Sequence, residues 1–245
     1  MPKLRFEKTR LKRKTALITG ATQGIGLAIA RALASEGCNL VICGRDQSRL
    51  QKIKAELSRE KVRVSAALCD IRDEGSVREM FTAICRQVPR IDILINNAGI
   101  AHASRPVGKL TVNDWNDVIA TNLTGMFLVT KAVLPLMKRG GIIVNNLSIA
   151  AKRVFPDSSA YNASKHGALG FTNTLREELR EQGIRVVSLL PGATNTGIWE
   201  TLWPEAPREK MISPETVARA LVNALKLPSD ATVEELTVMP TAGIL

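Results

Sequence analysis

Short apolar runs alternate with longer amphipathic stretches along almost the whole chain. Several runs are continuously apolar, which is typical of parallel strands buried on both faces. The pattern predicts seven strands, at residues 16–19, 40–43, 62–68, 91–95, 141–147, 184–190 and 236–239. It predicts six helices, at residues 25–35, 46–59, 75–86, 112–138, 158–182 and 214–225. Asp46 can cap the second helix, and Pro135 should kink or close the fourth.

The repeated order of strand and then helix predicts a single α/β domain. Right-handed crossovers place such strands in a doubly wound parallel sheet of about seven strands, with helices on both faces. No shift in composition marks a second domain, so the predicted domain runs from residue 14 to residue 245. The apolar share of 45% is enough for a sizeable core.

The longest irregular stretch, residues 192–213, is expected to form a lid, because loops of this length in compact domains are usually functional. It follows Pro191 and contains Trp199 and Trp203. The two tryptophans would align on a short helix. There they would either cap an apolar substrate or dock the lid on the domain.

Positive charge is concentrated at the start of the chain. The formal net charge is +11, and residues 1–14 hold seven Lys and Arg residues against Glu7. We predict a basic arm over residues 1–13 that is solvated rather than packed. No apolar segment of the kind found in a secretory signal follows it. Aromatic residues make up only 4% and do not interleave with basic ones, so no nucleic-acid partner is expected.

Composition also bears on membranes, metals and compartment. No window of 18 residues is continuously apolar, so no membrane span is expected. The four cysteines lack C-x-x-C spacing and the two histidines lie far apart, so we expect neither a metal site nor a disulfide framework. This cysteine usage favours a reducing compartment, the cytoplasm.

A glycine-rich turn follows the first predicted strand. From Thr19 to Gly26 it has the spacing G-x-x-x-G-x-G, unlike the G-x-G-x-x-G of the standard dinucleotide fingerprint. Glycines let the backbone turn sharply and approach a diphosphate, and the following helix N-terminus offers free N–H groups to its charge. The turn therefore indicates a dinucleotide site. A tight turn without a ligand is the alternative.

The end of the second predicted strand bears on the choice of cofactor. In dinucleotide folds an acid here binds the ribose 2′-hydroxyl, whereas an Arg accommodates a 2′-phosphate. This chain has Gly44 followed by Arg45, which favours NADP over NAD. An ordinary surface Arg is the alternative. Gln23, in the glycine turn, adds no second basic residue.

The chain has one tyrosine, Tyr161, and Lys165 lies four residues beyond it. On a helix this spacing places both side chains on one face. An ammonium near a phenol favours the phenolate, so we predict that the pKa of Tyr161 lies well below its usual value of about 10. Tyr161 would then act as a general acid and base. As a bare pattern the pair is weak, because amphipathic helices also carry it by chance.

Six motifs occur together in the order and at the spacings of a known family. They are Thr19-Gly20-x-x-x-Gly24-Ile25-Gly26, Asn96-Asn97-Ala98-Gly99, Asn122 within Thr121-Asn122-Leu123, Ser148, Tyr161-x-x-x-Lys165 and Pro191-Gly192. Over roughly residues 14–240 the chain resembles the short-chain dehydrogenase/reductase family, in its Rossmann-fold branch of roughly 250 residues.

The resemblance implies four catalytic residues. Tyr161 exchanges a proton with the carbonyl or hydroxyl oxygen, and Ser148 hydrogen-bonds that oxygen. Lys165 lowers the pKa of Tyr161 and binds the nicotinamide ribose. Asn122 holds a water that connects Lys165 to solvent. No metal is required.

The resemblance also implies a binding site for NADP(H). Asp70 would contact the adenine, Asn96 would line the adenosine ribose and diphosphate, and Thr194 and Thr196 would meet the nicotinamide carboxamide. The full predicted cofactor set is Gly20, Thr22, Gln23, Gly24, Ile25, Gly26, Arg45, Asp70, Ile71, Asn96, Ala98, Gly99, Tyr161, Lys165, Pro191, Gly192, Thr194 and Thr196. The predicted substrate pocket consists of Ser148, Ile149, Ala150, Phe155, Trp199 and Trp203.

Two segments depart from the family pattern. Asn146 and Leu147 precede Ser148 where relatives have a further Ser or Gly, and the chain ends in Val238–Leu245 rather than in an Asp-Gly-Gly-type segment. These changes leave the substrate and the oligomer open. The long apolar helices 112–138 and 158–182 favour a homodimer or homotetramer.

Four groups of residues are expected to have structural roles or none. Trp115 should pack in the core, His102 should be a solvated loop residue, and His166 should pack on its helix. The cysteines, Cys38, Cys43, Cys69 and Cys85, should be small buried side chains.

Together these features predict an oxidoreductase that transfers a hydride between NADP(H) and a carbonyl or secondary alcohol. The mostly apolar pocket set favours a fairly apolar ketone, reduced by NADPH. The alternative, from another class, is a non-catalytic NADP(H)-binding redox sensor. The intact set of Asn122, Ser148, Tyr161 and Lys165 argues against it, because a binding module needs no proton donor.

Overall fold

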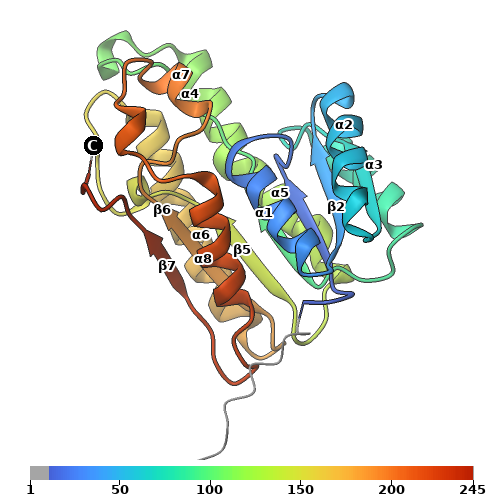
Figure 1. Ribbon diagram of the computed structural model, residues 1–245. Helices are drawn as coiled ribbons and strands as arrows, with labels where there is room; N and C mark the ends of the chain where they lie inside the picture. The colour runs from blue at the N-terminus through green and yellow to red at the C-terminus, as the bar shows by residue number, and fades with distance from the viewer. Residues whose placement is uncertain (1–10, 245) are drawn as a thin grey trace, which may run out of the picture.

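The computed structural model describes residues 11–244, and one parallel sheet of seven strands forms its centre (Figure 1). The strands lie in the order β3-β2-β1-β4-β5-β6-β7, so the chain winds outward twice from the middle of the sheet. They are β1 (Thr15–Thr19), β2 (Asn39–Gly44), β3 (Val64–Leu68), β4 (Ile93–Asn96), β5 (Ile142–Asn146), β6 (Arg185–Pro191) and β7 (Glu235–Val238). The predicted fold class is confirmed.

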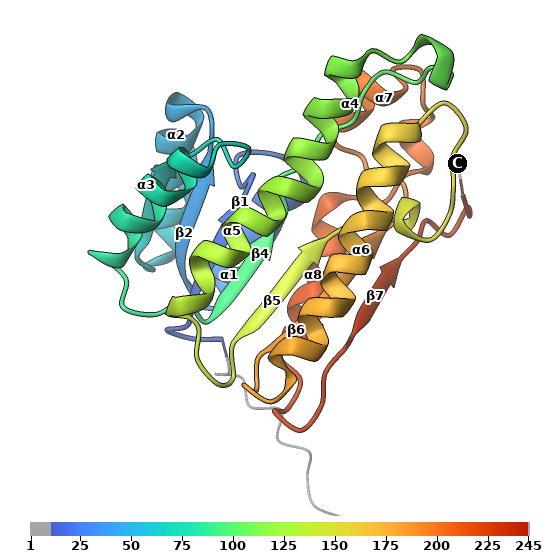
Figure 2. The same cartoon turned by 180° about the vertical axis from the view of Figure 1, so that it is seen from behind.

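Helices cover both faces of the sheet. In Figure 1, α1 (Gly24–Ser35) and α8 (Pro214–Leu225) lie in front of it, and α2 (Gln47–Leu57) joins the same apolar core. From behind, Figure 2 shows α5 (Gly125–Val133) and α6 (Ser159–Arg180) across the other face, whose core also includes α3 (Glu74–Cys85).

The protein has an apolar core on each face of the sheet, because successive side chains of a strand point to opposite faces. In β1, Leu17 belongs to the core under α3, α5 and α6, whereas its neighbour Ile18 belongs to the core under α1, α2 and α8. Both side chains are fully buried. Continuous apolar strands are therefore required here, as the sequence pattern indicated.

Several helices begin at a residue whose side chain accepts a hydrogen bond from the first turn of the helix. Asp46 accepts from the Arg49 N–H at the start of α2, and Asp73 accepts from the Ser76 N–H at the start of α3. The capping role predicted for Asp46 is thus confirmed.

The predicted helix over residues 112–138 is interrupted. The structure divides it into α4 (Val112–Ile119), a π-helical turn (Ala120–Thr124), α5 and a short 3-10 turn (Leu134–Leu136). Pro135 lies in the last of these, where the helix closes. The whole stretch Val112–Leu136 is long and apolar enough to cross a membrane by length and composition alone. In this fold its residues Val129 and Val133 are buried against the sheet.

Three expectations about single aromatic residues are wrong. Trp115 is 40% exposed, because α4 extends beyond the sheet and buries only Val118. His102 is buried, with its Nδ1 2.8 Å from the Ala103 carbonyl oxygen, and its loop contacts the lid through the Ser104 N–H, which donates to the Leu202 carbonyl oxygen. His166 is exposed on α6. Trp115 and His166 show that a side chain on an amphipathic helix need not face the core.

Among the cysteines, Cys38, Cys43 and Cys69 are buried as expected, whereas Cys85 is exposed. Cys85 is the last residue of α3, where the helix leaves the sheet. Burial raises the pKa of Cys38 to about 12, so its thiol stays protonated. All four thiols are free.

The predicted arm mostly lies outside the described residues, which begin at Leu11. Leu11 itself is buried, and its carbonyl oxygen accepts a hydrogen bond from the Cys38 Sγ at 3.0 Å. The Arg13 N–H donates to the Gly37 carbonyl oxygen at 2.9 Å. Residues 11–13 therefore pack against the domain.

Candidate active site

A cavity of about 730 Å³ opens at the carboxyl ends of the strands. Its walls come from residues at or just after the ends of all seven strands and from the lid. The centre of the sheet, where the chain reverses its direction of winding, is the place where α/β folds bind ligands. Nearly all of the predicted site residues line this one cavity.

The glycine turn after β1 brings the backbone close to the cavity. Gly20 and Gly24 have φ angles of 61° and 54°, which side chains rarely adopt. A Cβ on Gly20 would lie 2.8 Å from the Ala98 Cα, and one on Gly24 would lie 3.2 Å from the Thr196 Cγ2. Gly26 does not line the cavity, but a Cβ there would lie 2.4 Å from the Gly20 carbonyl oxygen. It allows α1 to begin close behind the turn.

The N-terminus of α1 is left free for a ligand. No side chain caps it, and its first turn holds no acidic residue. By contrast α2, α3, α4 and α8 are each capped by a side chain, from Asp46, Asp73, Thr111 and Ser213. Free backbone N–H groups beside a glycine turn that a side chain would fill are the arrangement that binds a diphosphate. The turn therefore fits a dinucleotide.

The end of the cavity beside β2 and β3 is lined by Arg45, Asp70 and Ile71. Arg45 is exposed at the rim. The Arg72 guanidinium donates to Asp70, with Nη2 2.7 Å from Oδ2, and these hydrogen bonds lower the pKa of the Asp70 carboxyl. A Cβ on Gly44 would lie 3.5 Å from the Thr22 Cγ2, an ordinary contact. The fold would therefore accept a larger residue at position 44, so the missing acid is not a steric requirement.

Asn96 does not face the cavity, contrary to the sequence-based expectation. Its Nδ2 donates to the Thr130 Oγ1 and to the Asn145 Oδ1, both at 2.9 Å, inside the core. The next residue, Asn97, lines the cavity instead. Successive residues of a strand point to opposite faces, so the second Asn of the pair faces the ligand side.

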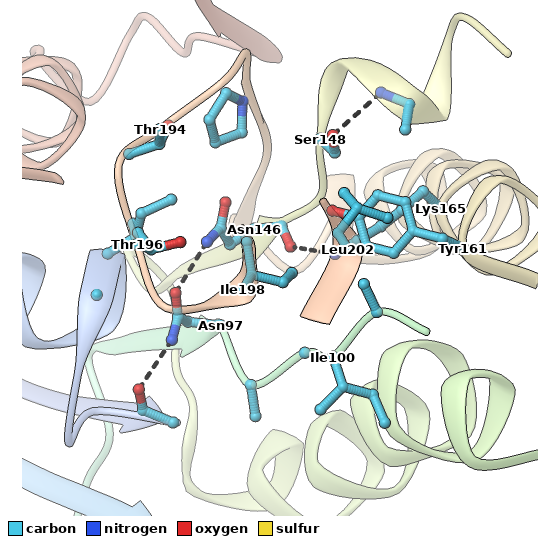
Figure 3. Close-up of a pocket in the computed structure, with 18 of the residues that line it drawn as sticks. Asn97, Ile100, Asn146, Ser148, Tyr161, Lys165, Thr194, Thr196, Ile198 and Leu202 are labelled. Atoms are coloured by element: carbon cyan, nitrogen blue, oxygen red, sulfur yellow. Dashed lines mark hydrogen bonds between the residues drawn. The ribbon is translucent and has the colours of Figure 1, made fainter. Parts of the chain in front are cut away.

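Asn97 connects the glycine turn to β5 (Figure 3). Its Nδ2 donates to the carbonyl oxygens of Thr19 and Gly20 at 3.0 and 3.1 Å, and its Oδ1 accepts from the Asn146 Nδ2 at 2.8 Å. The sequence analysis treated Asn146 only as a departure from the family pattern. The structure shows that, through Asn97, it links β5 to the glycine turn.

Ser148, Tyr161 and Lys165 meet in the middle of the cavity (Figure 3). Ser148 follows β5, and its Oγ accepts from the Ala150 N–H at 3.1 Å. Tyr161 and Lys165 come from α6, with the Lys165 Nζ 5.5 Å from the centroid of the Tyr161 ring. Lys165 is only 5% exposed, and its Nζ donates to the Asn146 carbonyl oxygen at 3.2 Å.

Burial dominates the ionisation of this pair. It raises the pKa of the Tyr161 phenol above its usual range, and a hydrogen bond with Ser148 only partly offsets the rise. It lowers the pKa of Lys165 from 10.5 to about 8. The predicted lowering of the Tyr161 pKa is therefore wrong for the cofactor-free protein, because the sequence pattern contains no information on burial. At neutral pH Tyr161 holds its proton.

Asn122 lies in the π-helical turn, behind the cavity wall rather than in it. Its Oδ1 accepts from the Ile100 N–H at 2.8 Å, and its Nδ2 donates to the Ile100 carbonyl oxygen and to the Ser164 Oγ. A Cβ on Gly99 would lie 3.3 Å from the Asn122 Oδ1 and 3.6 Å from the Lys165 Nζ. Asn122 thus fixes the backbone beside Lys165.

The lid closes the other end of the cavity. It contains α7 (Ile198–Leu202), and backbone hydrogen bonds join Ala193 and Asn195 to Ile212 at its base. The Trp199 Nε1 donates to the Thr194 carbonyl oxygen at 2.9 Å, so this bond fastens α7 to the base of the lid, and Trp199 also lines the cavity. Trp203 lines the cavity as well but is 43% exposed.

Comparison with known proteins identifies the family. The sequence model of the short chain dehydrogenase family matches residues 14–207. The chain belongs to the short-chain dehydrogenase family. It is 37% identical over 236 residues to sulfoacetaldehyde reductase 2 of Chromohalobacter salexigens, covering 92% of this chain and 93% of that one.

Solved structures of this family have the same fold. An alcohol dehydrogenase of the archaeon Thermococcus sibiricus, complexed with 5-hydroxy-NADP, superimposes with a TM-score of 0.88 at 33% identity, over 94% of this chain and 97% of that chain. A variant of actinorhodin polyketide ketoreductase with NADPH gives a TM-score of 0.82 at 34% identity, over 93% and 96% of the two chains.

Several cavity residues of this short-chain dehydrogenase were missed by the sequence analysis. Ile198 and Leu202 belong to α7, whose apolar spacing could have indicated them. Ile100 and Ala101 continue the backbone after the Asn-Ala-Gly motif. Ile244, near the C-terminus, also lines the cavity, and no signal in the sequence points to it.

Proposed function

We propose that this short-chain dehydrogenase uses NADPH to reduce an uncharged, fairly apolar ketone to a secondary alcohol. One observation supports the proposal most strongly. Ser148, Tyr161 and Lys165 line the same cavity as a glycine turn whose following helix has no side-chain cap. A proton donor and a site for a dinucleotide diphosphate therefore share one space.

Different groups of cavity residues would contact successive parts of a bound NADP(H). The N–H groups of the Thr22–Gly26 turn would hold the diphosphate, Arg45 would hold the 2′-phosphate, and Asp70 and Ile71 would surround the adenine. Lys165 would bind the nicotinamide ribose, and Thr194 and Thr196 would contact the carboxamide. Bound there, the nicotinamide supplies the hydride for the carbonyl carbon.

Residues of the protein itself carry out and support the proton transfer. Tyr161, protonated at neutral pH, donates its phenolic proton to the carbonyl oxygen as that oxygen gains negative charge. The Ser148 hydroxyl donates a hydrogen bond to the same oxygen and orients the substrate. The Lys165 ammonium, held by the Asn146 carbonyl, stabilises the phenolate that remains.

The phenolate must then regain a proton from solvent. We assign the first step of this relay to the segment that contains Asn122 and Ile100. The Asn122 side chain is already engaged with Ile100 and Ser164, so the water that the family implies would be held by a main-chain carbonyl of the π-helical turn.

The substrate end of the cavity supports an uncharged substrate. Among the described lining residues the charged side chains are Arg45, Asp70 and Lys165, which belong to the cofactor end and the catalytic centre. The walls around Ser148 are formed by Ile100, Ile149, Ala150, Phe155, Ile198, Trp199, Leu202, Trp203 and Ile244. An apolar ketone would bury its surface there without leaving a charge unpaired.

We also propose a homodimer or homotetramer in the cytoplasm. Trp115 on α4 and Phe127 on α5 are 40% and 44% exposed. Figure 2 shows α5 across the face of the sheet opposite to α1 and α8. Phe127 meets Phe171 of α6 edge to face, with the ring centroids 6.2 Å apart. Aromatic side chains exposed on adjacent helices are typical of an interface between subunits.

A panel of ketones tests the function. NADPH consumption, followed by absorbance, should be fastest with uncharged, apolar ketones and slow with ketones that carry a carboxylate or sulfonate. The Tyr161→Phe variant should bind NADPH normally, measured by fluorescence, and lose most turnover. A protein that binds NADPH but reduces no member of the panel would favour the redox sensor instead.

A further inference from the structure

Three segments meet at one corner of the cavity rim, beside the position proposed for the 2′-phosphate. They are the glycine turn, the end of β2 and the first turn of α2. Gln23 and Arg45 line the cavity there. Arg49, on the first turn of α2, reaches the same corner from outside, and its Nη1 donates to the Gln23 Oε1 at 3.0 Å.

Arg49 is held from two sides. Its Nε lies 3.2 Å from the Asp46 Oδ2, and its backbone N–H donates to the Asp46 Oδ1 at 3.0 Å. Within residues 11–244 its third nitrogen, Nη2, has no hydrogen-bond partner. Because the Gln23 Oε1 accepts from Arg49, the N–H groups of the Gln23 amide remain available at the cavity.

The charges at this corner depend on Arg49. Asp46 directly follows Arg45, and its carboxylate would repel a phosphate that carries up to two negative charges. Arg49 pairs with that carboxylate and brings a second guanidinium to the corner. The other nearby acid, Asp70, is already paired with Arg72. Without Arg49, the Asp46 carboxylate would lose its ion pair, and Arg45 would bind the phosphate without a second guanidinium beside it.

We propose that Arg49, together with Gln23, forms the second half of the 2′-phosphate site and makes the enzyme select NADPH over NADH. This inference rests on the proposed cofactor. The glycine turn itself has Gln23 rather than a basic residue, so the second positive charge comes from α2 and is placed by the Gln23 amide. Guanidinium groups suit this task because their planar N–H donors match phosphate oxygens.

Binding of NADPH and NADH to the cofactor-free protein, measured by nucleotide fluorescence, tests the inference without relying on turnover. Arg49→Ala should weaken NADPH binding about three- to tenfold and change NADH binding less than about twofold. Lys52→Ala is the matched control, since it removes one positive charge from an exposed position of the same helix. It should change neither affinity.

Asp46→Asn gives a second, opposite test. Asn is a good N-cap, so α2 should remain intact. Removing the negative charge should tighten NADPH binding about two- to threefold and leave NADH binding unchanged. An NADPH affinity that does not rise in this variant would contradict the balance of charges proposed for this corner.

The outcomes separate the inference from the proposed function. Equal weakening of NADPH and NADH by Arg49→Ala would show a structural fastening only, and an unchanged NADPH affinity would show no role; either result overturns the inference alone. If the wild-type protein binds NADH as tightly as NADPH, the proposed cofactor preference fails and the inference fails with it.

Discussion

Burial determines the pKa values of Lys165 and Tyr161. In the cofactor-free protein, burial raises the pKa of the phenol and lowers that of the ammonium, since both charged forms are poorly solvated. The phenol is therefore ready to act as an acid at neutral pH. That state suits reduction, in which the first proton moves from Tyr161 to the substrate.

The buried ammonium should lower the stability of the folded protein. The pKa of Lys165 falls from 10.5 to about 8 on folding, so its charge destabilises the fold fully below pH 8, and the effect disappears as the pH rises through 10.5. Lys165→Met should therefore stabilise the cofactor-free protein at pH 7, by about 1–3 kcal/mol. Thermal unfolding at pH 7 and pH 10 would measure the gain.

The gain should shrink at pH 10, where the wild-type lysine is mostly neutral in the folded protein. Lys52→Met, at an exposed position of α2, is the control and should leave the melting temperature nearly unchanged at both pH values. A Lys165→Met protein that is less stable than wild type at pH 7 would show that the ammonium is a net stabilising group.

At the same scale, the sequence located most site residues but not their environment. Motif spacing alone places Ser148 after a strand and Tyr161 and Lys165 on one face of the next helix, and the structure brings these three into one cavity. The direction of the Tyr161 pKa shift could not follow from spacing, because it depends on how many atoms surround the phenol. The link from Asn146 to Asn97 likewise depends on two strands that pair only in the fold.

Among the elements, the structure explains most directly how α7 is held on the base of the lid. Trp199 fastens α7 to the base of the lid through one hydrogen bond to the Thr194 carbonyl oxygen. Trp199→Phe keeps the aromatic ring but loses this bond, at a cost of about 1 kcal/mol, so the population in which α7 is detached from the lid base should rise about fivefold. Limited trypsin digestion after Arg208 and Lys210, both within the lid, would report the opening.

The matched control is Trp203→Phe. Trp203 lines the cavity, but no hydrogen bond from its indole to a described residue is present. Its digestion rate should equal that of the wild type. Equal rates for the Trp199→Phe variant and the wild type would contradict the docking role of the Trp199 indole.

Element prediction from the sequence succeeded for strands and failed where tertiary contacts decide. Continuous apolar runs indicate strands that are buried on both faces, and all seven are present. The break in helix 112–138 could not be predicted, because nothing in local propensity favours a π-helical turn. The turn places Asn122 so that its side chain brackets the backbone of Ile100, a contact between distant parts of the chain.

For the whole molecule, the boundary between arm and domain can be located by truncation. Removal of residues 1–10 should leave the melting temperature and turnover nearly unchanged. Removal of residues 1–13 should lower the free energy of unfolding by about 2 kcal/mol, because the buried Leu11 side chain is lost. Denaturant unfolding of the two truncated proteins would compare them directly.

A substantial loss of stability or turnover on removing residues 1–10 alone would show that these residues contact the domain or a neighbouring subunit. The sequence suggested a boundary after residue 13, from charge alone. Leu11 interrupts the basic residues with an apolar side chain, and that apolar side chain is the part that packs.

The most direct test of the account is the pH dependence of kcat/KM for NADPH-driven ketone reduction. Because the reaction requires a protonated Tyr161 and a charged Lys165, the rate should be level at neutral pH and fall above an apparent pKa of about 8. Tyr161→Phe should lower the level part by a factor of about 100 or more and leave NADPH binding intact. A rate that rises from pH 6 to pH 9, or a Phe variant with near-normal turnover, would contradict the account.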